Sequence, residues 1–232
     1  MYFDITPDAE FTKTEKVPGP TKEEIRALVI SKMRLSDKDI VVDIGCGTGG
    51  LTVEFAKRAK NVFSVDINPD AIKTTRTNLE KLGLENKVEL IQEEGFQALD
   101  QIDDFTRIMI GGSNGNLDNI IEEAYIRLPV GGQIVITSIV LETATDSVRM
   151  LKDLGAEPEV VNLCVSKGVM LERGVMMKAL NPITIITARK QWKKWTLTNS
   201  PPFFYFFYIK KTTFFLKRIY TKKKLLGVDH NI

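Results

Sequence analysis

VVDIGCGTGG, at residues 41–50, joins a short apolar strand to a turn rich in glycine. The residues that follow, LTVEFA, have the pattern of an amphipathic helix. A strand, a glycine-rich turn and a helix in this order bring backbone N–H groups close to a ligand at the start of the helix. The stretch therefore predicts a ligand-binding loop after the first strand of an α/β fold.

Apolar runs and helical patterns alternate on both sides of this loop. Strands are expected at 39–44, 61–67, 87–91, 106–110, 133–137, 157–165 and 180–188, and helices at 22–34, 50–59, 69–82, 95–101, 117–128 and 142–154. The strands are too apolar to face water on either side, which is typical of a parallel sheet covered by helices. We predict a Rossmann-like α/β fold whose seven-stranded sheet is mostly parallel with an antiparallel last strand, and whose helices lie on both faces.

The start of the first helix carries a capping pattern. Thr21 is followed three residues later by Glu24, and Pro18-Gly-Pro20 sets a turn just before them. A threonine and a glutamate at this spacing satisfy two free N–H groups of the first turn reciprocally. We therefore expect Thr21 to cap the helix over 22–34.

Several function classes are excluded by composition. The 232 residues contain two cysteines, Cys46 and Cys164, and a single histidine, His230, which argues against a disulfide framework, a histidine metal site and a Ser-His-Asp triad. No apolar run approaches the roughly 18 residues of a membrane span, and the N-terminal MYFDITPDAEF lacks the features of a signal peptide. A cytosolic location is expected, with chemistry that depends on a bound cofactor.

The C-terminal segment differs from the rest of the chain. Residues 191–232 carry nine Lys/Arg and one acid, a net charge of +8, and 11 of the 19 aromatic residues, whereas residues 1–190 have a net charge of −6. Basic residues interleaved with aromatics suit a membrane surface or a nucleic acid, but the bias is also that of unselected sequence from an AT-rich genome. We favour the latter and predict a domain over 1–190 and a tail over 191–232 outside the fold.

The glycine loop alone is compatible with a dinucleotide or with S-adenosylmethionine. The third glycine, Gly49, comes four residues after Gly45 rather than five, although Gly50 satisfies the dinucleotide spacing. Asp43 precedes the loop, and an acid there would repel a pyrophosphate but suits a ligand with an ammonium and a sulfonium group. We therefore expect S-adenosylmethionine as the cofactor.

Two later positions fit the same cofactor. Asp66 ends the second strand about 20 residues past the loop, where a carboxylate accepts hydrogen bonds from ribose hydroxyls; the alternative is a turn residue or helix cap before Pro69. After the third strand, Glu94 is placed to accept from the adenine amine and Gly95 to approach the ring, although a first-turn acid of a helix would have the same sequence. Together these residues predict a methyltransferase.

Further motifs give the chain a family resemblance. The sequence resembles the decarboxylating cobalt-precorrin-6B C15-methyltransferases of anaerobic cobalamin biosynthesis over roughly residues 3–189. The segments that carry the resemblance are VPGPTKEEIR (17–26), VVDIGCGTGG (41–50), SVDINPDAI (64–72), IMIGGSNGNL (108–117), LPVGG to TSIVLET (128–143) and RGVMMKALNP (173–182). The tail departs from the family, whose members end near the last strand.

The resemblance implies a seven-stranded methyltransferase fold assembled as a homotetramer. It implies methylation at C15 of a corrinoid intermediate, with loss of CO₂ from the acetate side chain at C12. The implied cofactor-binding residues are Thr21, Gly45, Cys46, Gly47, Thr48, Gly49, Asp66 and Gly95. No membrane or nucleic-acid partner is expected.

Candidate substrate contacts are basic side chains and backbone amides that suit the carboxylates of a corrinoid. Lys167, Arg173 and Lys178 are such side chains, although solvated surface charges would look the same. The amides at Gly112 and Ser113 add anion contacts. We predict Gly112, Ser113 and Arg173 as substrate residues and assign no catalytic acid or base.

Three other functions stay open from the residues alone. An RNA methyltransferase could use the basic tail on phosphates, although the fourth strand ends in Ile110-Gly-Gly-Ser113, without the Asn/Asp-Pro-Pro turn of many N6-adenine enzymes. A non-catalytic protein could keep the same S-adenosylmethionine pocket. An NAD-dependent oxidoreductase is disfavoured by Asp43.

Overall fold

The computed structural model describes residues 4–192. The chain divides at residues 191 and 192 into two compact units, and the first unit contains the fold described below. The tail that the sequence predicts to lie outside the fold falls, from residue 193 on, outside the described residues. Within residues 4–192, no helix is long and apolar enough to cross a membrane.

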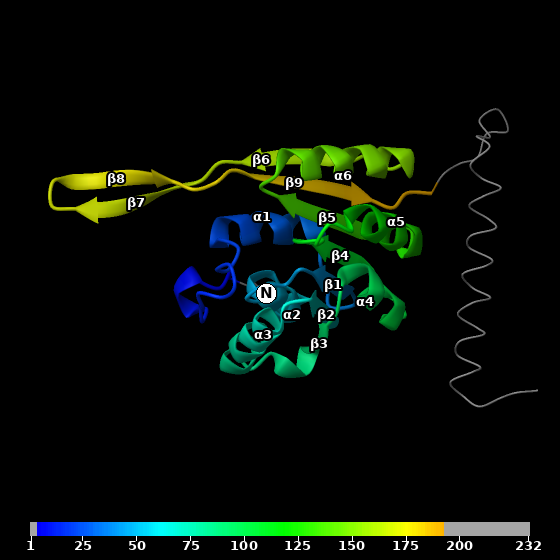
Figure 1. Ribbon diagram of the computed structural model, residues 1–232, viewed down its shortest axis with the longest axis horizontal. Helices are drawn as coiled ribbons and strands as arrows, with labels where there is room; N and C mark the ends of the chain where they lie inside the picture. Colours follow the sequence, from blue (N-terminus) through cyan, green and yellow to red (C-terminus); the bar gives the residue numbers. More distant parts are fainter. Residues whose placement is uncertain (1–3, 193–232) are drawn as a thin grey trace, which may run out of the picture. The chain divides into compact units, whose positions relative to one another are not determined.

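A seven-stranded sheet forms the centre of this unit (Figure 1). Its order is β3-β2-β1-β4-β5-β9-β6, with β1 (Ile40–Ile44), β2 (Asn61–Asp66), β3 (Val88–Gln92), β4 (Arg107–Ile110), β5 (Gln133–Ser138), β6 (Glu159–Leu163) and β9 (Ile183–Arg189). The first five strands are parallel, and β9 is antiparallel to both of its neighbours. The predicted fold class is confirmed, including the antiparallel last strand of the chain, β9, which lies inside the sheet between β5 and β6.

Helices cover both faces of the sheet (Figure 1). The elements on one face are α1 (Glu23–Met33), α2 (Gly50–Arg58) and α3 (Pro69–Lys81), and those on the other are α4 (Gly95–Gln101), α5 (Leu117–Arg127) and α6 (Leu141–Asp153). Alternate strand residues feed two separate cores, because successive side chains point to opposite faces. Val41 packs in the core with α1 and α2, and Val42 packs in the core with α4, α5 and α6.

The predicted capping box at α1 is wrong. The helix begins at Glu23, its N-cap residue is Lys22, and no side chain caps it. The two residues of the expected box have other partners: the Glu24 carboxylate lies 3.0 Å from Lys167 Nζ, and the Thr21 carbonyl accepts a hydrogen bond from the guanidinium of Arg26. Tertiary contacts therefore replace the local pattern.

Arg26 also fastens the N-terminal segment to the body. Its fully buried guanidinium donates to the carbonyl of Thr6 and lies 2.8 Å from Asp8 Oδ1. The fully buried carboxylate of Glu54 on α2 accepts the Thr6 N–H at 2.8 Å and pairs with Arg58 at 2.7 Å. Buried charges are stable only when paired and hydrogen-bonded, so this network fixes the path of the chain ahead of α1.

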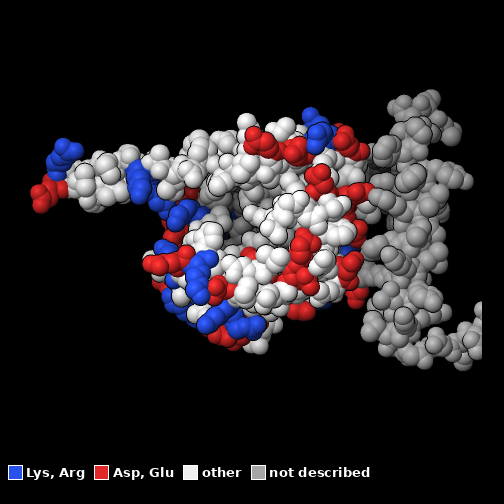
Figure 2. All heavy atoms as spheres, in the orientation of Figure 1, with Lys and Arg blue, Asp and Glu red and all other residues white. Residues whose placement is uncertain are grey.

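A second, two-stranded sheet was not predicted from the sequence. It is a hairpin of β7 (Ser166–Leu171) and β8 (Gly174–Ala179), placed between β6 and β9, and it projects from the main sheet (Figure 1). Figure 2 shows it as largely uncharged, with charged side chains at its tip and its base. Its exposed large apolar residues are Val169, Met170, Leu171, Val175, Met176 and Met177. The remaining described elements are two short 3₁₀ helices, η1 (Asp8–Glu10) and η2 (Glu85–Lys87).

Candidate functional site

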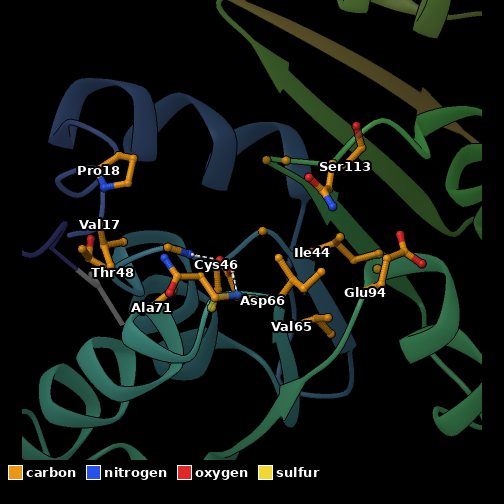
Figure 3. A pocket seen from close by; sticks show the side chains of 18 of the residues that line it. Val17, Pro18, Ile44, Cys46, Thr48, Val65, Asp66, Ala71, Glu94 and Ser113 are labelled. Atoms are coloured by element: carbon orange, nitrogen blue, oxygen red, sulfur yellow. Dashed lines mark hydrogen bonds between the residues drawn. The ribbon is translucent and has the colours of Figure 1, made fainter.

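A cavity of about 390 Å³ lies where the strand order reverses, between β1 and β4 at the carboxyl edge of the sheet. This is the position at which open parallel sheets bind ligands. Four loops that follow strands β1 to β4 and the segment before α1 enclose it (Figure 3). Its lining residues are Val17, Pro18, Gly19, Thr21, Ile44, Gly45, Cys46, Gly47, Thr48, Val65, Asp66, Ile67, Asn68, Ala71, Glu93, Glu94, Gly95, Gly111, Gly112, Ser113 and Asn114.

The glycine loop forms the floor of the cavity. Gly45 has a φ of 77°, and its N–H donates to the carbonyl of Val65 at 2.9 Å. A Cβ at Gly45 would lie 2.6 Å from the backbone nitrogen of Gly112 in the loop after β4. Both the left-handed backbone and the close approach of the two loops require glycine here.

Asp66 lies in the cavity at the end of β2, as predicted. One carboxylate oxygen accepts the N–H of Gly47 at 2.9 Å, and the other accepts the N–H of Asn68 at 2.9 Å (Figure 3). Each oxygen has a second lone pair for a further donor. The carboxylate therefore fixes the glycine loop and can still accept hydrogen bonds from a ligand.

Asp43 does not line the cavity, contrary to the expectation that this acid faces the ligand. It lies under the loop, where Thr52 Oγ1 donates to its carboxyl group at 2.6 Å and itself contacts Ser64 Oγ at 2.9 Å. Burial raises the pKa of Asp43 to about 7, although the Thr52 hydrogen bond opposes the shift. Since successive strand residues point to opposite faces, this side chain is turned towards α2 and away from the ligand space.

Cys46 lines the cavity as a neutral thiol. Burial, with a contribution from Asp43, raises the pKa of Cys46 to about 12. Its Sγ lies 3.6 Å from Thr75 Oγ1. The thiol therefore serves as a small apolar wall and supplies neither a thiolate nucleophile nor a base.

Two buried oxygens at the cavity have no protein partner. Oε2 of Glu94 caps α4 by accepting the N–H groups of Phe96 and Gln97 at 3.0 and 3.2 Å, while its Oε1 is left without a hydrogen bond. Oγ1 of Thr48 is also without one. Buried polar atoms are nearly always satisfied in folded proteins, so two orphans beside one cavity indicate a ligand that supplies their partners.

The predicted residues divide between the cavity and the hairpin. Seven of the eight predicted cofactor residues line the cavity, as do Gly112 and Ser113. The eighth, Gly49, is not part of the lining: it is the N-cap residue of α2, and its α-carbon packs against Thr75. Arg173 lies in the turn of the hairpin and is not part of the lining. Lys167 pairs with Asp8 and Glu24, and the hydrogen bond to Glu24 raises the pKa of Lys167. Among the described residues, the cavity lining therefore contains no Lys or Arg.

Several lining residues were missed from the sequence. Val17 and Pro18 come from the segment before α1, and Asn114 comes from the loop after β4. Asn114 has a φ of 46°, which the Asn-Gly pair at 114–115 could have indicated as a turn. No local signal indicated that Val17 and Pro18 fold over the glycine loop, because that position depends on the buried network around Arg26.

Comparison with known proteins gives one consistent family. Residues 14–190 match the precorrin methyltransferase domain. A relative in Methanobrevibacter smithii, named "Probable cobalt-precorrin-6B C(15)-methyltransferase (decarboxylating)", is 47% identical over 184 residues, which cover 79% of this chain and 98% of the relative.

Solved structures agree with the sequence relatives. A crystal structure from Methanobacterium thermoautotrophicum, described as precorrin 8W decarboxylase, is 40% identical with a TM-score of 0.77 and covers 79% of this chain and 98% of its own. A precorrin-6y C5,15-methyltransferase from Geobacter metallireducens is 35% identical with a TM-score of 0.75 and covers 82% of this chain and all of its own.

Proposed function

The chain belongs to the precorrin methyltransferase family, and on that premise we propose that it methylates C15 of cobalt-precorrin-6B and removes CO₂ from the acetate side chain at C12. The observation that carries the proposal is a family match over residues 14–190 that includes every loop around the cavity. The methyl donor that we propose is S-adenosylmethionine.

The residues of the cavity fit this donor. The Asp66 carboxylate keeps acceptor capacity for ribose hydroxyls, and Oε1 of Glu94 needs the kind of donor that an adenine amine provides. A Cβ at Gly95 would lie 2.7 Å from Cγ2 of Ile44 and 3.0 Å from Cδ1 of Ile120, so glycine is required for the start of α4 to pack against the sheet beside the cavity. Thr21, Gly45, Cys46, Gly47 and Thr48 would hold the remainder of the cofactor, and Gly49, with its φ of 81°, would shape the loop where it enters α2.

Positioning provides the rate in this mechanism. S-adenosylmethionine, when bound, supplies a methyl group that is already activated for transfer to carbon. The protein would hold the acceptor carbon in line with that methyl group, at the mouth of the cavity beside the β4 loop with Gly112 and Ser113. The lining offers no histidine or lysine, and the Cys46 thiol stays protonated, so the described residues supply no strong base.

Decarboxylation places a different demand on the site. The electrons that the departing CO₂ leaves behind enter the conjugated macrocycle of the substrate. The protein contributes by removing water from around the acetate carboxylate, which destabilises the charged starting state. Ser113 Oγ and the N–H groups of the β4 loop are the groups that would orient this side chain.

We propose that the protein self-associates through the β7–β8 hairpin, as the homotetramer implied by the family resemblance. An isolated two-stranded hairpin is marginally stable in water, and this one exposes six large apolar side chains. In an assembly, Arg173 at the hairpin tip would lie far from its own cavity and could reach a neighbour's substrate. The predicted cytosolic location stays a prediction.

The test is incubation with methyl-labelled S-adenosylmethionine and cobalt-precorrin-6B, followed by detection of labelled corrinoid and of CO₂. We expect both products in equal amounts. A folded protein that binds S-adenosylmethionine but releases neither product would refute the corrinoid assignment and favour a non-catalytic binding role. A parallel reaction with tRNA tests the RNA alternative, which the family match and the absence of cations in the described cavity lining disfavour.

A further inference from the structure

The loop between β5 and α6, together with the first residue of α6, exposes three consecutive large apolar residues. Ile139 is 66% exposed, Val140 is 48% exposed and Leu141 is 75% exposed. Single exposed apolar residues are ordinary on protein surfaces, but a run of three at one place indicates a surface that meets another molecule.

Local stability does not explain these residues. Val140 is the N-cap residue of α6, a position at which Ser, Thr, Asp and Asn are preferred, and no side chain caps this helix. Ser138 Oγ holds the loop, since it accepts the N–H of Val140 at 2.9 Å and donates to its carbonyl at 2.9 Å. The loop is therefore held in a conformation in which α6 lacks a side-chain cap and apolar side chains are exposed. Departures of this kind from local sequence preference are expected at functional sites.

This loop is a neighbour of the cavity. Strands β4 and β5 are adjacent and parallel, with Ile110 in register with Ile136, so the loops that follow them leave the same edge of the sheet side by side. The loop after β4 lines the cavity, and the loop after β5 carries the apolar run. Figure 1 shows α6 beginning at the edge from which the hairpin projects.

The size of the cavity leaves the acceptor outside it. About 390 Å³ is near the lower end of the range for small-molecule sites and suits one ligand of cofactor size. A corrinoid macrocycle with its acid side chains is larger than the cofactor, so its ring must cover the mouth of the cavity and extend over adjacent surface. Three side chains are too few for a protein partner, since a standard interface buries roughly 800 Å² on each side.

We propose that Ile139, Val140 and Leu141 form an apolar platform under the corrinoid ring and set the enzyme's specificity for a flat macrocycle. The inference rests on the proposed function and extends it to the acceptor. The platform positions the ring so that its reacting carbon lies over the β4 loop, where the methyl group is delivered.

A matched pair of valines tests the platform. Val140→Ser removes an apolar side chain from it, and Val130→Ser removes an equally exposed valine, also 48%, from the turn before β5 at the opposite edge of the sheet. We expect Val140→Ser to raise the KM for cobalt-precorrin-6B about tenfold and to leave the KM for S-adenosylmethionine unchanged. Because serine is a better N-cap than valine, the Tm of this variant should stay level or rise. Val130→Ser should leave both KM values unchanged.

The outcomes separate the platform from the proposed function. An inactive wild-type protein refutes the proposed function and, with it, the platform. If the wild type is active but Val140→Ser and Leu141→Ser have the same KM for cobalt-precorrin-6B as Val130→Ser, the platform is refuted and the proposed function is not. A change of molecular mass in sedimentation with an unchanged KM also refutes it, since the loop would then be a contact between copies. Equilibrium binding of cobyrinic acid, a stable corrinoid, gives the same comparison without turnover.

Discussion

Replacement of Gly45 by alanine should damage the fold and the site together. Two costs arise in the structure: the left-handed φ of 77° costs a non-glycine residue about 1–2 kcal/mol, and a Cβ placed 2.6 Å from Gly112 N forces the β1 and β4 loops apart at a further cost of about 1–3 kcal/mol. We expect a total loss of about 2–5 kcal/mol in the free energy of unfolding. Affinity for S-adenosylhomocysteine should fall more than tenfold, because both loops line the cavity.

The control for this variant is Gly83→Ala. Gly83 has a φ of 66°, and a methyl group added there would meet no atom within 4 Å, so this variant carries the backbone cost without the clash. Urea unfolding followed by circular dichroism measures the stability of both variants, and calorimetry measures the affinity. Equal destabilisation by Gly45→Ala and Gly83→Ala, with affinity retained in both, would show that the β1 and β4 loops do not approach each other as described.

Four further predictions concern single features. Asp66→Asn loses the charge and turns one of the two acceptor oxygens into an NH2 donor that faces a backbone N–H, so S-adenosylmethionine binding should weaken about 10- to 100-fold in calorimetry and the Tm should fall as well. Arg26→Met removes the donor to two carbonyls and one of the two cations paired with Asp8, so it should cost about 3–5 kcal/mol in urea unfolding. A loss under about 1 kcal/mol would contradict the role given to the buried network. The pKa of Asp43 is raised from 3.8 to about 7 in the folded state, so between these pH values the folded protein binds a proton that the unfolded chain has lost. The free energy of unfolding should therefore fall as pH rises from about 4 to about 7. Asp43→Asn should flatten this dependence when unfolding is measured at a series of pH values. Met170→Lys combined with Met177→Lys should reduce the molecular mass in sedimentation if the hairpin holds copies of the chain together, and an unchanged mass would exclude that role.

The main elements were predictable because each has a strong local pattern. The strand at 40–44 is apolar throughout except for Asp43, and the helix at 50–58 follows a glycine turn, so both could be placed within a residue or two. The hairpin at 166–179 was missed because its valines and methionines are exposed and therefore follow no core period. The predicted capping box is wrong because its two residues have other partners. The buried guanidinium of Arg26 binds the carbonyl of Thr21, and Lys167, which is far away in the sequence, pairs with Glu24.

The part of the site that lies directly after the strands β1 and β2 was predictable from the sequence. The glycines and Asp66 follow directly from the strand-to-loop pattern, since residues at the carboxyl ends of adjacent parallel strands meet at one edge. Asp43 was misplaced because the sequence does not show which face of β1 it points to. Pro18 and Asn114 could not be placed because their positions depend on how separate segments pack across the sheet edge.

The position of β9 has a consequence for the order of folding. In the sheet, β6 is an edge strand whose neighbour is β9, and β9 in turn separates β6 from β5. A nascent chain that ends before residue 183 therefore offers β6 no place in the sheet and leaves β5 as a bare edge, which is a site for mispairing. The hairpin joins β6 to β9 through β7 and β8 as one long ribbon, so closure of its short turn brings the two late strands together at low entropic cost. Strand β6 can therefore join the sheet only after β9 has been synthesised, although β6 comes earlier in the chain.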